Sequence, residues 1–350
     1  MGSRAVGRAS VGRAAMGNAP SGGDAMGSGT APGEAGGGGT GGGGTGAGGG
    51  EFRLIEEIVS PVAERRPPDG FSELATSVDG VMINYVRGGD GPTLVLLHGY
   101  PQTWYMWRKV MPEFGQHYTV VAPDLRGAGD SAAPAGGYDK KTLAGDVHGL
   151  LAQLGLDESV RIIGHDIGMM VAYSYAAQHP DSVQRLVLCE SLIPDESVYH
   201  LPALTQHGPG IWNFGLFNVD SGFPERLVAG RELAWVRGFM GAQAVHPEGI
   251  DDQSLREYAR CLLDEEHLSA SFAYFRTLDQ DVADNAEYAQ SPLPMPVLAI
   301  GAAGSLGDSV SAQVARYAQD VSSGVVDGSG HWLFEEQPDK LSQQLLGFLE

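Results

Sequence analysis

The feature that most constrains this chain is an aspartate in a tight turn between an apolar strand and a helix. Residues 161–170 read Arg-Ile-Ile-Gly-His-Asp-Ile-Gly-Met-Met, which places Asp166 at the centre of a Gly-x-Asp-x-Gly turn. The two glycines permit a sharp strand-to-helix turn that raises the central side chain above the sheet edge. A carboxylate in that position attacks saturated carbon and leaves an ester that water must hydrolyse. The alternative is that Asp166 is only the acidic N-cap of the following helix.

An apolar run upstream has the pattern of a buried parallel strand that leads into a functional loop. Residues 92–97 are apolar and are followed by residues 98–101, His-Gly-Tyr-Pro. Where a nucleophile stands in a strand–turn–helix, two backbone N–H groups form an oxyanion hole that stabilises the negative oxygen of the intermediate. One amide comes from this loop and the other from the residue after the nucleophile. These amides belong to Tyr100 and Ile167.

A histidine near the C-terminus follows the last apolar strand. That strand lies within residues 321–327, and residues 328–332 read Gly-Ser-Gly-His-Trp ahead of a helix at 338–349. A base in such a loop can lean over the nucleophile, and the chain order of nucleophile before histidine fits. We predict that His331 is the catalytic base and assign no chemical role to the other nine histidines.

Together these ordered motifs resemble the α/β-hydrolase superfamily over about residues 71–350. Within it they resemble the branch with an aspartate nucleophile, which contains epoxide hydrolases and haloalkane or haloacetate dehalogenases. The resemblance implies an α/β-hydrolase fold with a mostly parallel eight-stranded sheet, helices on both faces and an inserted helical cap. It also implies a two-step reaction in which Asp166 opens the substrate to a covalent ester and His331 activates water to cleave it.

The acid that orients the histidine is the point at which the sequence departs from the commonest family pattern. The family usually carries this acid in the loop after strand seven, where the expected position is Gly304 and the next carboxylate is Asp308. The other known location is the end of strand six, where Glu190 follows the apolar residues 185–189. A buried carboxylate there needs a partner, which the N–H of His331 would supply. We predict Glu190, which resembles the glutamate of some bacterial epoxide hydrolases, with Asp308 as the alternative acid.

The alternation of strands and helices stops between residues 195 and 292, where apolar residues recur at helical spacing. The family inserts its cap at this point, and the cap closes an apolar pocket over the nucleophile and excludes water. We expect the pocket to be lined by aromatic and polar side chains of the core and cap, namely His98, Trp104, Trp212, Asn213, Tyr274, Phe275 and Trp332.

Epoxide opening needs an acid on the ring oxygen, since an alkoxide is a poor leaving group. The family supplies it from cap tyrosines, or from a tyrosine and a histidine. The matching positions here are Phe275 and Asn213, neither of which can give up a proton. Tyr274 is one residue earlier, which on a helix turns it about 100° away.

A dehalogenase is the second hypothesis, because a halide needs only N–H donors, which Trp212 and Asn213 could provide. Haloalkane dehalogenases usually have tryptophan after the nucleophile, where this chain has Ile167. Haloacetate dehalogenases usually place arginines there, where this chain has Ile167, Met169 and Met170. We therefore predict an epoxide hydrolase that gives a vicinal diol, with a dehalogenase second and a weakly catalytic, pathway-specific α/β-hydrolase-like protein third.

Composition sets the domain organisation of the 350 residues. The first fifty are about two-fifths glycine, which predicts a disordered tail over 1–50. We expect an N-terminal extension over 51–70 that includes a short helix, an α/β-hydrolase core over 71–194 and 293–350, and a cap over 195–292.

Net charge and cysteine content limit which macromolecules, membranes and metal ions the protein is expected to bind. The formal net charge of -21 argues against nucleic acid and anionic membrane surfaces, and no apolar stretch approaches the roughly 20 residues of a membrane-spanning helix. Two cysteines make no disulfide framework, and no Cys/His cluster has zinc spacing. We expect a cytoplasmic enzyme without metal or cofactor that acts on a small apolar substrate and water, with a homodimer left open.

Overall fold

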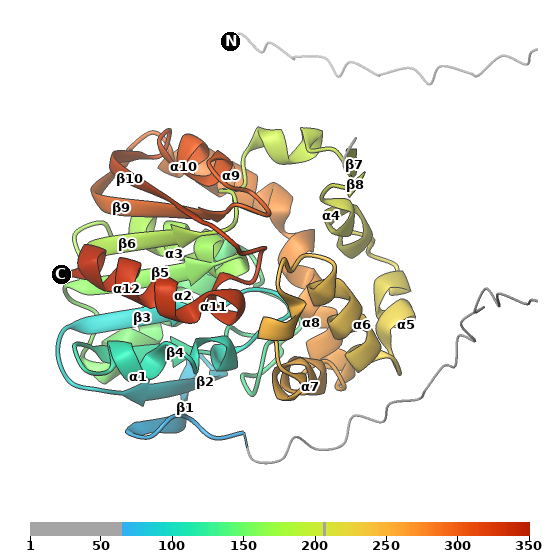
Figure 1. Ribbon diagram of the computed structural model, residues 1–350, viewed down its shortest axis with the longest axis horizontal. Coiled ribbons are helices and arrows are strands. Elements are labelled where there is room, and N and C mark those ends of the chain that lie inside the picture. Colours follow the sequence, from blue (N-terminus) through green and yellow to red (C-terminus); the bar gives the residue numbers. More distant parts are fainter. Residues whose placement is uncertain (1–64, 206–207) are drawn as a thin grey trace, which may run out of the picture. The chain divides into compact units, whose positions relative to one another are not determined.

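The structure is a computed structural model that describes residues 65–205 and 208–350. The predicted tail over 1–50, and residues 51–64 of the predicted extension with its short helix, lie outside the described residues. An eight-stranded sheet runs through the described part in the order β1-β2-β4-β3-β5-β6-β9-β10 (Figure 1). Its strands are β1 (Phe71–Val78), β2 (Val81–Gly88), β3 (Thr93–Leu97), β4 (Thr119–Pro123), β5 (Val160–His165), β6 (Val183–Cys189), β9 (Leu293–Ala302) and β10 (Ala318–Val326).

The sheet is mostly parallel, as predicted. β2 runs antiparallel to its neighbours β1 and β4, and the pairings from β4 through β10 are parallel. Every residue of β3 and β4 is buried, which explains why these strands read as unbroken apolar runs. Such runs are typical of parallel strands with helices on both faces.

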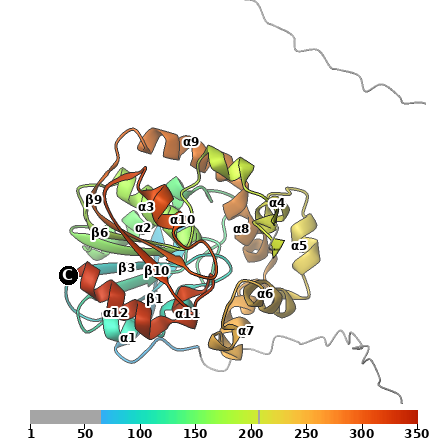
Figure 2. The same ribbon diagram turned by 45° about the horizontal axis from the view of Figure 1, so that its top comes forward.

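Helices cover both faces of the sheet (Figures 1 and 2). One face carries α1 (Met111–Phe114), α11 (Leu333–Glu336) and α12 (Pro338–Leu349), and the other carries α2 (Lys140–Leu154), α3 (Ile167–Gln178) and α10 (Ser309–Val314). The one-turn segment η1 (Trp104–Trp107) follows the loop after β3.

The segment between β6 and β9 is mainly helical and lies beside one end of the sheet (Figure 1). It contains η2 (Glu196–His200), the short pair β7 (Leu204–Thr205) and β8 (Gly208–Pro209), α4 (Trp212–Phe217), α5 (Phe223–Val228), α6 (Glu232–Gly241), η3 (Pro247–Gly249), α7 (Asp252–Arg260), α8 (Glu265–Arg276) and α9 (Leu278–Tyr288). α9 packs against α2 and α3 of the core, whereas α4 and α5 pack against α8, and α6 packs against α7.

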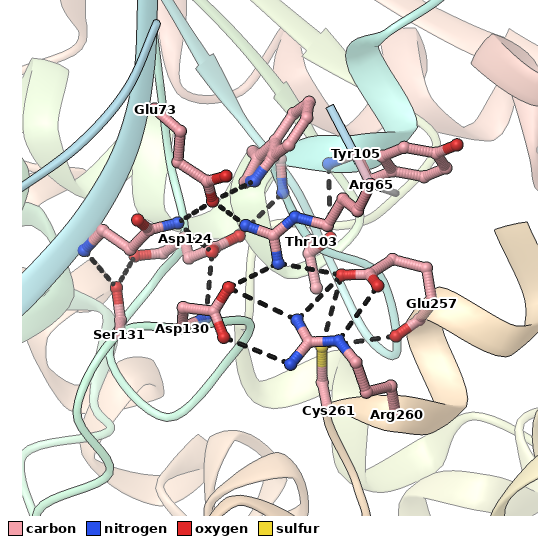
Figure 3. Close-up of polar contacts among 12 residues, drawn as sticks. Arg65, Glu73, Thr103, Tyr105, Asp124, Asp130, Ser131, Glu257, Arg260 and Cys261 are labelled. Atoms are coloured by element: carbon pink, nitrogen blue, oxygen red, sulfur yellow. Dashed lines mark hydrogen bonds and ion pairs between the residues drawn. The ribbon is translucent and has the colours of Figure 1, made fainter. Parts of the chain in front are cut away.

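A cluster of charged side chains joins α7 to the core (Figure 3). The Arg65 guanidinium forms ion pairs with Glu73 on β1, with Asp130 in the loop after β4, and with Glu257 on α7. Arg260 pairs with the same Asp130 and Glu257 at 3.2 and 2.9 Å. Burial alone would raise the pKa of Asp130, but the two arginines hold it below its usual value. We refer to these five residues as the Arg65 cluster.

Two absences among the described residues bear on membranes and metal ions. No helix in ranges 65–205 and 208–350 has the length and apolar character needed to cross a bilayer. Within the same ranges, no group of histidine, cysteine, aspartate and glutamate side chains is arranged to hold a metal ion.

Candidate active site

Asp166 stands at the first position after β5 and directly precedes α3. Its backbone has φ 54° and ψ -122°, a conformation that typically costs a non-glycine residue on the order of 1–3 kcal/mol. The side chain makes no capping hydrogen bond to α3, so the alternative of a simple helix N-cap is wrong. Two residues on, a Cβ at Gly168 would collide with the carbonyl oxygens of Leu97 and His98, which accounts for the second glycine of the turn.

The backbone amides predicted for the oxyanion hole surround the Asp166 carboxylate. The Tyr100 N–H donates to Asp166 Oδ1 at 2.8 Å, and the Ile167 amide lies beside this carboxylate and lowers its pKa. Burial would raise the pKa of Asp166, but His331 and the Ile167 amide hold it below its usual value. The carboxylate is therefore ionised at neutral pH, with Oδ1 held by the Tyr100 amide and Oδ2 turned to the histidine.

His331 lies between two carboxylates. Its Nε2 is 3.4 Å from Asp166 Oδ2, and its Nδ1 is 3.6 Å from Glu190 Oε1. Burial alone would lower the pKa of His331, but the two carboxylates raise it to about 9. The imidazole is therefore protonated at neutral pH while both carboxylates are ionised.

Glu190 is fully buried at the first position after β6. Its Oε2 accepts from the Ala302 N–H at 2.5 Å and its Oε1 from the Leu306 N–H at 3.2 Å. Burial would raise the pKa of Glu190, but His331 and these donors hold it below its usual value. Asp308, the alternative acid, is exposed at the start of α10. The structure thus brings Glu190, and not Asp308, to the histidine.

A cavity of about 150 Å³ opens beside Asp166. Its wall combines side chains that follow β5, β6, β9 and β10 with side chains of the helical segment. Apolar residues dominate, among them Met170, Leu192, Ile193, Phe214, Phe239 and Phe275. A cavity of this size and lining can enclose a small apolar molecule.

A family model described as "alpha/beta hydrolase fold" matches residues 92–338 of the chain. This protein belongs to the α/β-hydrolase family. The fold and the family predicted from the sequence motifs are both confirmed.

Named relatives of this α/β hydrolase include enzymes of two kinds. It is 33% identical over 276 residues to a soluble epoxide hydrolase of Corynebacterium sp. (strain C12), covering 77% of this chain and 94% of that protein. It is 30% identical over 296 residues to a fluoroacetate dehalogenase of Burkholderia sp., covering 80% of this chain and 94% of that protein. The solved structure of Cfl2 from Burkholderia cenocepacia is similar with a TM-score of 0.75 and 36% identity, covering 82% of this chain and 99% of that chain.

Asn213 and Phe275 line the cavity of this α/β hydrolase, as expected, but Tyr274 and Trp212 do not. Tyr274 is turned toward the core, where its hydroxyl donates to the Arg126 carbonyl oxygen at 2.5 Å. Trp212 is 39% exposed at the start of α4. Tyr274 and Phe275 are neighbours on one helix, so only one of them can face the cavity.

Three core residues were also wrongly expected in the cavity wall. The ring of His98 is buried, and its Nε2 accepts from the Leu125 N–H at 3.0 Å. Trp104 is fully buried in η1. Trp332 directs its indole N–H to the Met240 carbonyl oxygen at 2.8 Å. These side chains build the scaffold under the site.

Sequence reasoning missed Glu336, which fastens the loop that carries the histidine. One of its carboxylate oxygens accepts from the N–H groups of Gly330 and Trp332 at 3.0 and 3.2 Å. The other accepts from Val245 and His246, both at 2.8 Å. The signal in the sequence is only an acidic residue five positions after His331, which is too common to identify such a role.

A second histidine supports the same loop. His165 Nε2 lies 2.8 Å from the His331 carbonyl oxygen, and burial lowers the pKa of His165 to about 4. The ring is therefore neutral at physiological pH and can donate Nε2–H to that carbonyl. His165 directly precedes Asp166 in the turn, so one strand end positions both Asp166 and the loop that carries His331.

Proposed function

We propose that this α/β hydrolase is an epoxide hydrolase that converts a small apolar epoxide to a vicinal diol through an ester on Asp166. One observation carries the proposal: an ionised carboxylate after β5 is held by the Tyr100 amide and faces a histidine backed by Glu190, at the wall of an apolar cavity. The relationship to a soluble epoxide hydrolase at 33% identity supports it.

In the first step, Asp166 Oδ2 attacks an epoxide carbon and the ring C–O bond breaks. Oδ1 is already bonded to the Tyr100 amide, so Oδ2 is the oxygen available for attack. The Asp166 side chain is only 15% exposed, so its carboxylate is poorly hydrated, which favours attack on saturated carbon. The epoxide oxygen takes up one proton as the ring opens, so the product is a hydroxyalkyl ester whose carbonyl oxygen is Oδ1.

In the second step, a water molecule attacks the ester carbonyl carbon. Ester formation removes the negative charge of Asp166, which is the foremost contact that raises the pKa of His331. The pKa of His331 then falls toward its ordinary value, so the imidazolium gives up its proton and the neutral imidazole can take one from the water. Glu190 stabilises the imidazolium that results, and the Tyr100 and Ile167 amides stabilise the oxyanion.

A dehalogenase is the second candidate because of the fluoroacetate dehalogenase relative at 30% identity. Fluoroacetate carries a carboxylate, which requires a cation in the site. Among the described residues of the cavity wall, none is lysine or arginine. The wall therefore suits a neutral, apolar substrate better than a haloacetate.

Mass spectrometry of a trapped adduct tests the proposal. A His331→Gln variant should accumulate the ester when it is incubated with small apolar epoxides, because the base that cleaves the ester is missing. The intact mass should rise by the full mass of the epoxide, and peptide mapping should place the adduct on Asp166. A haloalkane would instead add an alkyl group without its halogen.

Asp166→Asn in the same background is the matched control and should give no adduct, since a neutral amide is not a nucleophile at saturated carbon. An adduct on another residue, or none with any epoxide while haloalkanes react, would contradict epoxide hydrolysis.

A further inference from the structure

Among the described residues, the cavity wall has no acid at the two ring-opening positions of the family pattern, as the sequence predicted. Phe275 and Asn213 occupy those positions and both line the wall. Among the described lining residues, the titratable side chains are Asp166, Glu190, His331 and Tyr100. The first three already have roles in forming and hydrolysing the ester, which leaves the phenol of Tyr100.

Tyr100 is fixed next to the nucleophile by its own backbone. Its N–H bonds to Asp166 Oδ1, so its side chain starts within the site. Its ring lies between two aromatic rings of the cavity wall, Phe239 and Phe275 with centroids at 5.3 and 5.6 Å, and two rings behind the wall, Phe217 and Phe272 at 5.0 and 6.1 Å. The tyrosine therefore extends from the loop after β3 into the aromatic wall of the cavity and lines that cavity itself.

The phenol oxygen of Tyr100 accepts a hydrogen bond and has a proton to give. Trp235 on α6 donates its indole N–H to this oxygen at 2.8 Å. No acceptor for the hydroxyl proton is present among the described residues. Burial raises the pKa of Tyr100, so the phenol stays protonated at neutral pH, while the Trp235 N–H acts in the opposite direction. The hydrogen bond from Trp235 to the phenol oxygen strengthens as negative charge develops on that oxygen.

We propose that Tyr100 is the acid that protonates the epoxide oxygen, with Trp235 stabilising the tyrosinate; this rests on the proposed epoxide hydrolysis. As the Asp166–carbon bond forms and the ring C–O bond breaks, the phenol proton moves to the epoxide oxygen. Loss of the Asp166 charge then lets the His331 imidazolium give its proton to the tyrosinate, and the neutral imidazole takes a proton from the attacking water. Hydrolysis of the ester gives the Asp166 carboxylate and the diol, with His331 protonated and Tyr100 a phenol, as at the start of the cycle.

The test separates the two chemical steps. Tyr100→Phe keeps the ring and the backbone amide but removes the phenol. In a His331→Gln background, the rate of adduct formation with styrene oxide should fall by about 100-fold, within the range typical of a lost general acid. With His331 intact, the rate at which the preformed ester is hydrolysed should stay within about threefold of the parent, since the amides of the oxyanion hole remain.

Three further variants sharpen the result. Trp235→Phe should slow adduct formation by less than Tyr100→Phe, and Phe275→Tyr should restore part of the rate lost in Tyr100→Phe by returning a phenol to the wall. Tyr173→Phe is the matched control, because Tyr173 is a buried tyrosine with a raised pKa that does not line the cavity, and both rates should be unchanged.

Two outcomes overturn the role of Tyr100: adduct formation at the parental rate in Tyr100→Phe, or equal slowing of both steps, which indicates a structural role. Failure of the proposed function is seen separately, as an absence of any epoxide adduct in the His331→Gln parent.

Discussion

At the scale of single residues, Asp166 and Glu190 occupy equivalent backbone positions at the ends of two strands. Each is the first residue after a parallel strand, and each has a positive φ, 54° and 53° respectively. The N–H of Asp166 bonds to the Cys189 carbonyl oxygen and that of Glu190 to the Ile300 carbonyl oxygen, so each is tied to the next strand across the sheet. Two adjacent strand ends therefore present two carboxylates to one histidine, His331.

The role of Glu190 can be tested against that of Asp308. Glu190→Gln should slow ester hydrolysis by about 100-fold or more, because the amide no longer stabilises the imidazolium, and the alkyl-enzyme should accumulate. Asp308→Asn should leave the rate nearly unchanged, since Asp308 is exposed. Single-turnover kinetics with a reactive epoxide measures both; a severe loss in Asp308→Asn beside an active Glu190→Gln would move the acid to the loop after β9.

The charge state of His331 gives a prediction on pH. In the resting enzyme its pKa is raised to about 9 by Asp166 and Glu190, and NMR titration of the ring should give a value well above 6.5. Asp166→Asn removes one of the two negative charges, so the pKa should fall. A titration that gives an ordinary pKa in the parent, or no change in the variant, would contradict the proposed switch of His331 from imidazolium to base.

The same shift predicts how stability varies with pH. Because the pKa of His331 is higher in the folded than in the unfolded protein, its contribution is complete below about pH 6.5 and is lost as the pH rises through about 9. The melting-temperature difference between the parent and His331→Gln should therefore shrink over that interval. Asp166 and Glu190 have lowered pKa values and act in the opposite sense, so their contribution is lost at acid pH.

At the scale of elements, the sequence predicts what depends on local pattern. Asp166 and Glu190 directly follow apolar strands, so the ends of those strands in the sequence predict where the two carboxylates lie. The amide of Tyr100 was predicted in the same way, from the loop that follows the apolar run at residues 92–97. The cavity wall could not be predicted in the same way. Whether Tyr274 or Phe275 faces the cavity depends on how α8 is rotated against the core, and the helical pattern alone does not determine that rotation.

Sequence motifs also did not predict contacts between elements that are distant in the sequence. Glu336 on α11 bonds to the N–H groups of Val245 and His246, which follow α6. This carboxylate joins the loop of His331 to the helical segment over the site. This role depends on the tertiary contact between α11 and the chain after α6. The spacing of residues along the sequence does not predict that contact.

At the scale of the whole molecule, the Arg65 cluster ties the start of the described chain to α7 (Figure 3). The Arg65 side chain is 9% exposed and contacts three carboxylates, one of which, on Glu257, is fully buried. Arg260 also pairs with Glu257, so loss of Arg65 leaves that carboxylate with one cation. Asp130 and Glu73 are more exposed, so water can hydrate their carboxylates and offset part of the loss of the ion pairs with Arg65.

Two truncations should therefore behave differently. A chain that begins at Glu51 should keep the melting temperature and kinetics of the full chain, because residues 1–50 are glycine-rich and carry little apolar surface to bury. A chain that begins at Pro67 loses Arg65 and should be less stable by about 1–3 kcal/mol, below the 3–5 kcal/mol typical of a fully buried pair that loses one partner. Thermal unfolding of both measures the difference.

The full-length Arg65→Met variant is the matched control, because it removes the charge without shortening the chain. It should account for most of the destabilisation of the chain that begins at Pro67, since both leave Glu73, Asp130 and Glu257 without the same cation, and the truncation also removes Arg66, which has contacts of its own. If only the truncation destabilised, residues before Pro67 other than Arg65 would carry the effect. If the chain that begins at Glu51 were already destabilised, the first fifty residues would contribute buried contacts that their composition does not predict.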